Sequence, residues 1–161
     1  MQPFIKSATR NGEPFDVRLQ ARRIDGERFF VNPYVRVGSP KGIISNYAGG
    51  GYTMALDMFL RSNYNQDEQV EIKSKIMQLG EEFPSHYANL LGDGRIFDLG
   101  LDLAVAKEGE SFKLWLFEVN TLIGGHNYGL GDAKAHCMYL RYLVDNYASD
   151  NEAIRGIAIG Q

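Results

Sequence analysis

The stretch Leu114-Trp115-Leu116-Phe117-Glu118-Val119-Asn120 is an apolar strand that ends with a carboxylate and an amide two residues apart. Alternate side chains of a strand share a face, so Glu118 and Asn120 are expected on the face of Leu114 and Leu116. The other face then carries Trp115, Phe117 and Val119. Two largely apolar faces are typical of a strand inside a sheet, where an ionised glutamate is costly unless a cation or several donors compensate it. That cost indicates a functional role for Glu118.

Composition predicts one globular domain. The 161 residues are 44% hydrophobic and 12% aromatic, enough for one sizeable core. The net charge of -3 arises from 17 basic and 20 acidic residues without long runs, so nothing favours nucleic acid or an anionic membrane as a partner. We find no membrane span or signal peptide pattern. Cys137 is the only cysteine, which favours a reducing, cytoplasmic location and a buried structural thiol.

Strand patterns predict two antiparallel hairpins. Residues 15–24 and 28–37 flank Asp25-Gly26, a strong hairpin signal, and residues 96–106 and 112–120 flank a turn at 107–110. A short strand is expected at residues 2–6. Residues 38–52 are rich in Gly, Ser, Pro and Asn, which predicts a long loop or a glycine-flexible lid.

Two helices complete the predicted fold. Apolar residues recur at helical spacing between Gln66 and Phe83, and Pro84 is expected to kink or restart that helix. Residues 133–147 are expected to close the core, with an inward face of Cys137, Leu140, Leu143 and Val144. The resulting fold class is α+β, a mainly antiparallel sheet with helices packed on one face. No dinucleotide-binding or P-loop glycine pattern opens a helix.

The second hairpin gathers oxygen donors. Asp98 and Asp102 share one face of their strand, and hairpin pairing brings Asp102 near Glu118 and Asn120. Three oxygen donors, with no cysteine and no helical histidine pair, suit Mg²⁺ far better than zinc. Water and substrate phosphates usually complete such a site, which indicates a nucleotide. By spacing alone, edge or salt-bridged carboxylates are an equally good interpretation.

Basic and glycine-rich elements are the other candidates. Arg18 and Arg36 lie on the first two long strands, where an arginine can clamp phosphate or carboxylate bidentately. Taken singly, each is more often part of a solvated ion pair. The segment 46–51 can wrap phosphates with backbone N–H groups and an amide, and a plain flexible loop is the alternative.

Five short motifs follow one another along the chain: Pro14-Phe15-Asp16-Val17-Arg18, Arg36-Val37-Gly38, Asn46 through Gly49-Gly50, Asp98-Leu99-Gly100-Leu101-Asp102 and Glu118-Val119-Asn120. Their order resembles that of ATP-grasp ligases, and most of all the endospore coat-associated branch. The resemblance implies a carboxy-terminal ATP-grasp subdomain over residues 1–148, beginning at the adenine hinge, followed by a tail at 149–161.

The resemblance also implies site roles. In that family the matching positions imply that two Mg²⁺ ions are held by Asp102, Glu118 and Asn120, with Glu118 bridging them. Phosphates or the acyl-phosphate intermediate are contacted by catalytic residues matching Arg18, Arg36 and Asn46. The implied ATP contacts are Gln2, Phe4 and Ile5, which resemble the adenine hinge, and Gly49 and Gly50. The implied reaction activates a small-molecule carboxylate with ATP for attack by an amine or thiol, and phosphoryl transfer needs mainly positioning and charge neutralisation.

Three departures from the family pattern qualify these roles. The chain begins at the hinge, without the lysine-bearing subdomain or an amino-terminal substrate domain, so we expect the catalytic half of a longer ligase or a natural remnant. A non-catalytic nucleotide-binding, structural or oligomerisation module is the alternative, and exposed apolar sheet surface would favour a homo-oligomer. The turn at 107–110 leaves the pairing of Asp102 with Glu118 open by a residue or two. Residues 121–124 lack the proline that often follows the asparagine.

Overall fold

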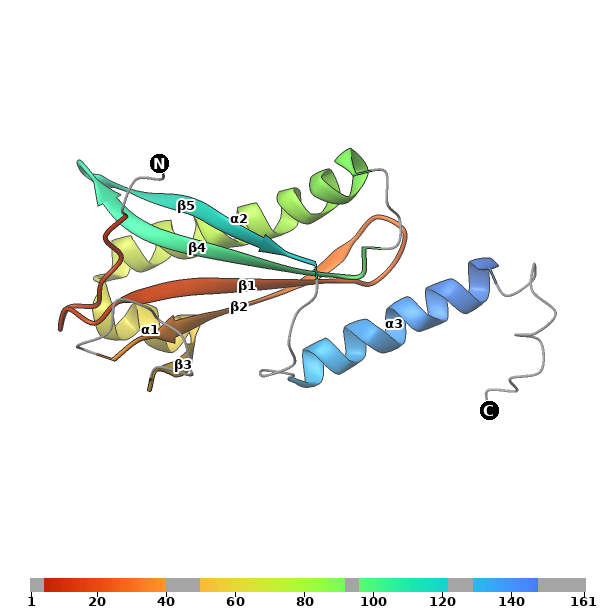
Figure 1. Cartoon of the computed structure of the whole chain (residues 1–161), viewed down its shortest axis with the longest axis horizontal. Coiled ribbons are helices and arrows are strands. Elements are labelled where there is room, and N and C mark those ends of the chain that lie inside the picture. The colour runs from red at the N-terminus through yellow and green to blue at the C-terminus, as the bar shows by residue number, and fades with distance from the viewer. Residues whose placement is uncertain (1–4, 40–49, 92–95, 122–128, 148–161) are drawn as a thin grey trace.

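Five antiparallel strands form one sheet in the order β3-β2-β1-β4-β5 (Figure 1). The computed structural model describes residues 5–39, 50–91, 96–121 and 129–147. Its elements are, in chain order, β1 (Phe15–Arg23), β2 (Phe29–Val37), β3 (Tyr52–Ala55), α1 (Leu56–Asn63), α2 (Gln66–Leu90), β4 (Asp98–Glu108), β5 (Ser111–Asn120) and α3 (Leu130–Tyr147). The α+β class and both predicted hairpins are confirmed. Of the strand expected at 2–6, Ile5 and Lys6 are described and are not in a strand.

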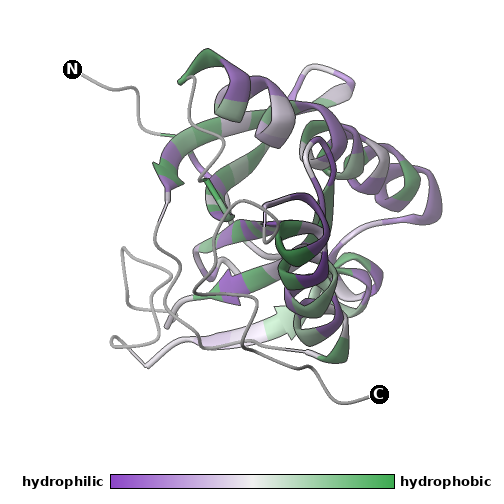
Figure 2. Cartoon of the chain, turned by 90° about the vertical axis from the view of Figure 1, so that its right-hand side faces the viewer, coloured by the Kyte–Doolittle hydropathy of each residue, from purple (hydrophilic) through white to green (hydrophobic). Residues whose placement is uncertain are grey.

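The side chains of the central strand β1 alternate between two unlike faces of the sheet. Its apolar side chains, among them Val17 and Leu19, point to one face and pair with apolar residues of β2 and β4. Its polar side chains point to the other: Asp16, Arg18, Gln20 and Arg22. Apolar and polar residues accordingly alternate along the ribbons (Figure 2).

Helices α1 and α2 cover the apolar face. In α2, Ile72, Ile76, Gly80, Pro84 and Ala88 are buried at a constant spacing of four residues. Helix α2 packs closely on β2, because a Cβ atom on Gly80 would lie 2.6 Å from Cγ1 of Val31. Pro84 was expected to kink or restart the helix. The helix does not restart there, since it runs through Pro84 to Leu90, and Pro84 and Ala88 continue the buried stripe. The short helix α1 was not predicted.

Helix α3 lies against the opposite, polar face. The expectation that helices pack on one face therefore holds for α1 and α2 only. Its buried residues are Asp132, Ala135 and Tyr139, and Asp132 forms an ion pair with Arg22. The predicted inward face is wrong, since three of its four members are exposed, namely Cys137, Leu140 and Val144. The helix turns Asp132 inward because this face of the sheet offers Arg22 and Asn32 as partners, and Tyr139 stacks on Phe97.

Strand β5 is an edge strand, which corrects the prediction that it lies inside the sheet. Glu118 pairs with Asp102 and Leu116 with Leu103, so Phe117 is an extra, bulged residue. The bulge moves Glu118 and Asn120 to the polar face, away from Leu116. Consequently Leu116 and Phe117 are 39% and 49% exposed at the edge. The turn is also tighter than predicted, because Glu108 pairs with Ser111 and Gly109 adopts φ +65°.

Hydrogen bonds to Glu71 connect α2 to the start of β5. Its carboxylate accepts hydrogen bonds from Lys75, from Ser111 Oγ at 2.6 Å and from the backbone N–H of Phe112 at 2.9 Å. The hydrogen bond from Lys75, followed by those from Ser111 and Phe112, lowers the pKa of Glu71 from 4.5 to about 2.

The Glu71→Gln variant is expected to be less stable than the parent at neutral pH and equally stable in strong acid. Because folding lowers this pKa, the stabilisation is complete above pH 4.5 and is lost as the pH falls toward about 2. Urea unfolding across that range measures the difference. Glu81→Gln, at an exposed position of the same helix, is the control. A gap between Glu71→Gln and parent that persists unchanged at pH 2 would contradict the assignment.

Candidate functional site

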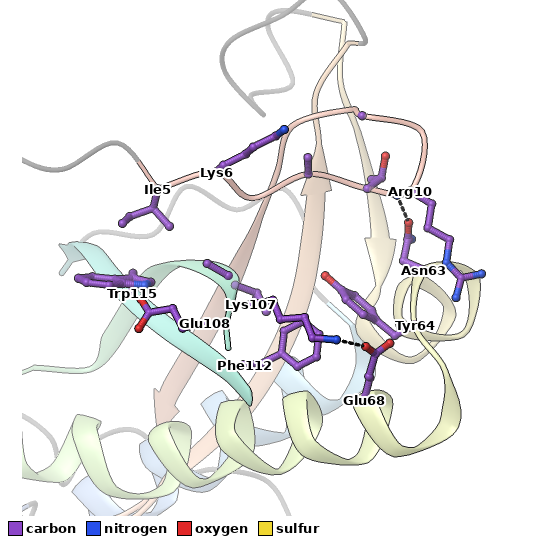
Figure 3. Close-up of a pocket in the computed structure, with 15 residues that line it drawn as sticks. Ile5, Lys6, Arg10, Asn63, Tyr64, Glu68, Lys107, Glu108, Phe112 and Trp115 are labelled. Carbon is purple, nitrogen blue, oxygen red and sulfur yellow. Dashed lines mark hydrogen bonds and ion pairs between the residues drawn. The ribbon is translucent and has the colours of Figure 1, made fainter. Parts of the chain in front are cut away.

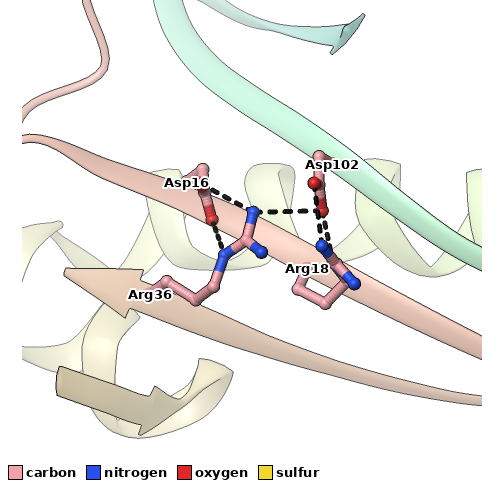
Figure 4. Close-up of polar contacts among 4 residues, drawn as sticks. All are labelled: Asp16, Arg18, Arg36 and Asp102. Atoms are coloured by element: carbon pink, nitrogen blue, oxygen red, sulfur yellow. Dashed lines mark hydrogen bonds and ion pairs between the residues drawn. The ribbon is translucent and has the colours of Figure 1, made fainter. Parts of the chain in front are cut away.

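A cluster of charged side chains lies on the polar face of the sheet, where β1, β2 and β4 run side by side (Figure 4). Asp16 and Arg36 are directly opposite each other in the β1–β2 register. Their side chains form a bidentate pair, with Nε to Oδ1 at 2.6 Å and Nη2 to Oδ2 at 2.8 Å. Two parallel hydrogen bonds fix the plane of the guanidinium group.

Asp102 joins this pair to Arg18. It faces Arg18 across the β1–β4 register, and Arg18 donates from Nε to Oδ1 and from Nη2 to Oδ2, the latter at 2.9 Å. Nη2 of Arg36 lies 3.1 Å from Oδ1 of Asp102. Asp102 is only 2% exposed. One buried carboxylate thus lies between two guanidinium groups.

The carboxylates of Asp16 and Asp102 stabilise the charged form of Arg36. Burial alone would lower the pKa of Arg36, but the hydrogen bonds and charge of Asp16, and then the charge of Asp102, hold that pKa above its usual value. Arg36 is therefore a fixed cation. Since its side chain is 21% exposed and that of Arg18 is 13% exposed, both retain access from solvent.

The predicted metal ligands meet at this cluster. Glu118 is directly opposite Asp102 and Asn120 is opposite Gly100, so the uncertainty in the hairpin register is resolved in favour of direct pairing. Glu118 is exposed and Asn120 is half-buried. Within the described ranges, however, no three Asp, Glu, His or Cys side chains are grouped closely enough to hold a metal. The magnesium site stays a prediction.

The other predicted ligand contacts are only partly described. Gln2, Phe4, Asn46 and Gly49 lie outside the described residues. Gly50 has φ +82° just before β3. Ile5 lines a cavity of about 820 Å³ at the turn end of the β4–β5 hairpin (Figure 3), which includes Lys6, Arg10, Glu68, Lys107, Phe112 and Trp115 but no member of the Asp102 cluster.

A second charged cluster, centred on Arg22, lies under α3. The Arg22 side chain is fully buried, and its Nη1 is 2.8 Å from Oδ1 of Asp132. Its Nε lies 3.5 Å from Oδ1 of Asp98 and donates to Nε2 of His136 at 3.3 Å. Burial raises the pKa of Asp98, although the charge of Arg22 acts in the opposite direction. The sequence analysis placed Asp98 on one face of its strand with Asp102, but it missed Asp132, whose role depends on where α3 docks.

Between the two clusters lies a buried amide. Gln20 is 0% exposed, and within the described part of the chain neither of its side-chain polar atoms has a hydrogen-bond partner. It faces Gly100 on β4, which contributes no side chain. A buried amide of this kind is costly unless a polar group completes it.

This sheet and its motif-bearing strands are those of an ATP-grasp protein. A family model described as YheC/D like ATP-grasp matches residues 1–135, and the chain belongs to that family. It is 26% identical over 125 residues to the endospore coat-associated protein YheC of Bacillus subtilis (strain 168), an alignment that covers 77% of this chain and 33% of YheC. The chain spans about a third of the length of this curated relative. Among the helices described, none is long and apolar enough to cross a membrane.

Proposed function

We propose that this chain is the nucleotide-binding part of an ATP- and Mg²⁺-dependent ligase that joins a small-molecule carboxylate to an amine or thiol through an acyl phosphate. Membership of the ATP-grasp family supports the general kind of activity. The observation that carries the proposal is the placement of two solvent-accessible arginines and the Glu118–Asn120 pair on one face around Asp102. The arginines supply positive charge for a polyphosphate, and the oxygen donors suit the Mg²⁺ that accompanies it.

Arg18 and Arg36 are the proposed phosphate-binding residues. Each guanidinium already makes a bidentate contact with a carboxylate, and phosphate oxygens have a geometry that the same donors can bind. Asp16 keeps Arg36 oriented while the arginine binds its ligand. Gln20 is buried on the same face of β1 as Arg18, and its side-chain amide supplies a donor and an acceptor to a polar group that reaches it.

Asp102, Glu118 and Asn120 fit a magnesium ion in donor chemistry. All three offer oxygen, which is the donor that Mg²⁺ prefers, and the exposed Glu118 is open to an ion. Asp102 joins this set of metal ligands when Arg18 or Arg36, which both now contact its carboxylate, turns to bind phosphate instead. A bound Mg²⁺ neutralises phosphate charge, and Glu118 and Asn120 would hold it.

Calorimetric titration of the chain with ATP and Mg²⁺ tests the proposal. The parent chain is expected to bind, and Glu118→Ala is expected to weaken binding by roughly tenfold or more, because a metal ligand is lost. Glu110→Ala, which removes an exposed carboxylate from the turn of the same hairpin, is the matched control and should bind as the parent does. Equal affinity of all three proteins would sink the proposed site.

A non-catalytic nucleotide-binding or structural module is the second candidate. It is favoured by the arginines, which occupy both carboxylate oxygens of Asp102. Phosphate release in the presence of ATP, Mg²⁺ and a set of carboxylate and amine compounds separates the two functions. Steady turnover by the chain refutes the module, and nucleotide binding without turnover supports it.

A further inference from the structure

Helix α3 carries an apolar stripe on the side that faces away from the sheet. Its members are separated alternately by three and four residues, which is the heptad pattern of a helix that packs on another helix. The α3 stripe consists of Leu130, Ala133, Cys137, Leu140, Val144 and Tyr147. All six are exposed, with Leu130 at 89% and Leu140 at 61%. The heptad pattern predicts that the α3 stripe is buried, but the sheet of this chain does not cover it.

The α3 stripe is complementary to a second copy of itself. If two α3 helices lie antiparallel with a two-fold axis between Met138 and Tyr139, every stripe residue faces a different stripe residue of the second copy. The facing pairs are Leu130 with Tyr147, Ala133 with Val144 and Cys137 with Leu140. Each layer combines a smaller side chain with a larger one, so the same surface can interdigitate with its own copy.

The helix dipoles favour the antiparallel arrangement. Antiparallel helices bring the positive end of one macrodipole to the negative end of the other, whereas parallel helices place like ends together.

We propose that two copies of this chain associate through their α3 stripes as an antiparallel helix pair. The 18 residues of α3 form a strip about 27 Å long and about 10 Å wide. A strip of this size lies at the small end of specific interfaces, below about 1,200 Å² in total. The dimer is therefore concentration-dependent. This proposal is independent of the proposed ligase function, because the α3 stripe faces away from the Asp102 cluster.

The edge of β5 is the competing surface. Leu116 and Phe117 are exposed there, as a sheet-mediated oligomer would require. The bulge at Phe117 interrupts the row of backbone groups that a second strand would need, and Lys113 and Glu118 add charge to it. These features are typical of an edge that resists pairing.

Sedimentation equilibrium over a wide concentration range tests the proposal. The parent chain should dimerise, and Leu140→Glu should raise the dissociation constant roughly tenfold or more, because a charge would be buried in the helix pair. Val70→Glu, at a 60% exposed position of α2, is the matched control and should dimerise as the parent does. Circular dichroism confirms that each variant is folded. A parent chain that stays monomeric throughout, or a dimer that Phe117→Glu breaks and Leu140→Glu leaves intact, would overturn the proposal.

Cys137 reports the direction of the helices, since it is the only cysteine. A short thiol cross-linker should link a mixture of the parent chain and the Cys137→Ala, Leu140→Cys double variant more efficiently than either protein alone, because positions 137 and 140 face each other only across the antiparallel pair. Preferential linking of the parent chain to itself would show a parallel pair and contradict the arrangement.

Discussion

Replacing Arg22 with methionine is expected to lower the free energy of unfolding by about 3–5 kcal/mol, the usual loss when one partner of a buried ion pair is removed. The Arg22 side chain is fully buried, and that of Asp132, 2.8 Å away, is 1% exposed. Without the guanidinium, the buried carboxylate of Asp132 and the half-buried carboxylate of Asp98 would remain under α3. Urea unfolding at neutral pH measures the loss.

Two further variants test whether the loss of stability comes from the burial of the Arg22–Asp132 ion pair or from the removal of any ion pair. Arg28→Met breaks the Arg28–Asp25 pair, whose arginine is 72% exposed, and should cost less than about 1 kcal/mol. Adding Asp132→Leu to Arg22→Met should recover part of the loss, because it removes the unpaired carboxylate. Equal losses for Arg22→Met and Arg28→Met would show that Arg22 is not a buried structural charge.

The central hairpins could be predicted because their signals are local. Asp25-Gly26 between two alternating runs determines the β1–β2 turn, and the register follows from it. Such alternation also places Asp98 and Asp102 on one face of β4, whereas the pairing of Arg18 with Asp102 depends on the long-range β1–β4 register. The bulge at Phe117 has no comparable signal, so simple alternation put Glu118 on the wrong face relative to Leu116. One extra residue reverses the face of everything that follows it.

The orientation of α3 could not be predicted from periodicity. The helix carries one apolar stripe, and the usual rule places such a stripe inward. Here the surface available to it is a charged sheet face, where Asp132 binds Arg22 and Asn32. Which side of the helix is buried therefore depends on the partner surface, and that surface is formed by strands more than 90 residues earlier in the chain.

Asp102→Asn is expected to separate the metal-binding role of Asp102 from its pairing with the arginines. The variant keeps the shape of the side chain and removes its charge, so Arg18 and Arg36 lose a shared anion. Since hydrogen bonds to charged groups contribute about 1.5–3 kcal/mol, we expect a loss of stability of that order. The freed guanidinium groups should then bind ATP more tightly in the absence of Mg²⁺, because phosphate replaces the missing carboxylate.

In the presence of Mg²⁺ the expected effect of Asp102→Asn has the opposite sign. If Asp102 is a metal ligand, affinity for ATP with Mg²⁺ should fall by roughly tenfold or more while affinity measured with EDTA rises. Asp16→Asn is the matched control, because Asp16 also holds Arg36 but is not an expected ligand. Its affinities for ATP with Mg²⁺ and with EDTA should change in the same direction, so that the response to Mg²⁺ is preserved. Were both variants to respond alike in the two titrations, Asp102 would be a partner of the arginines alone. The buried carboxylate would then favour the module over the ligase.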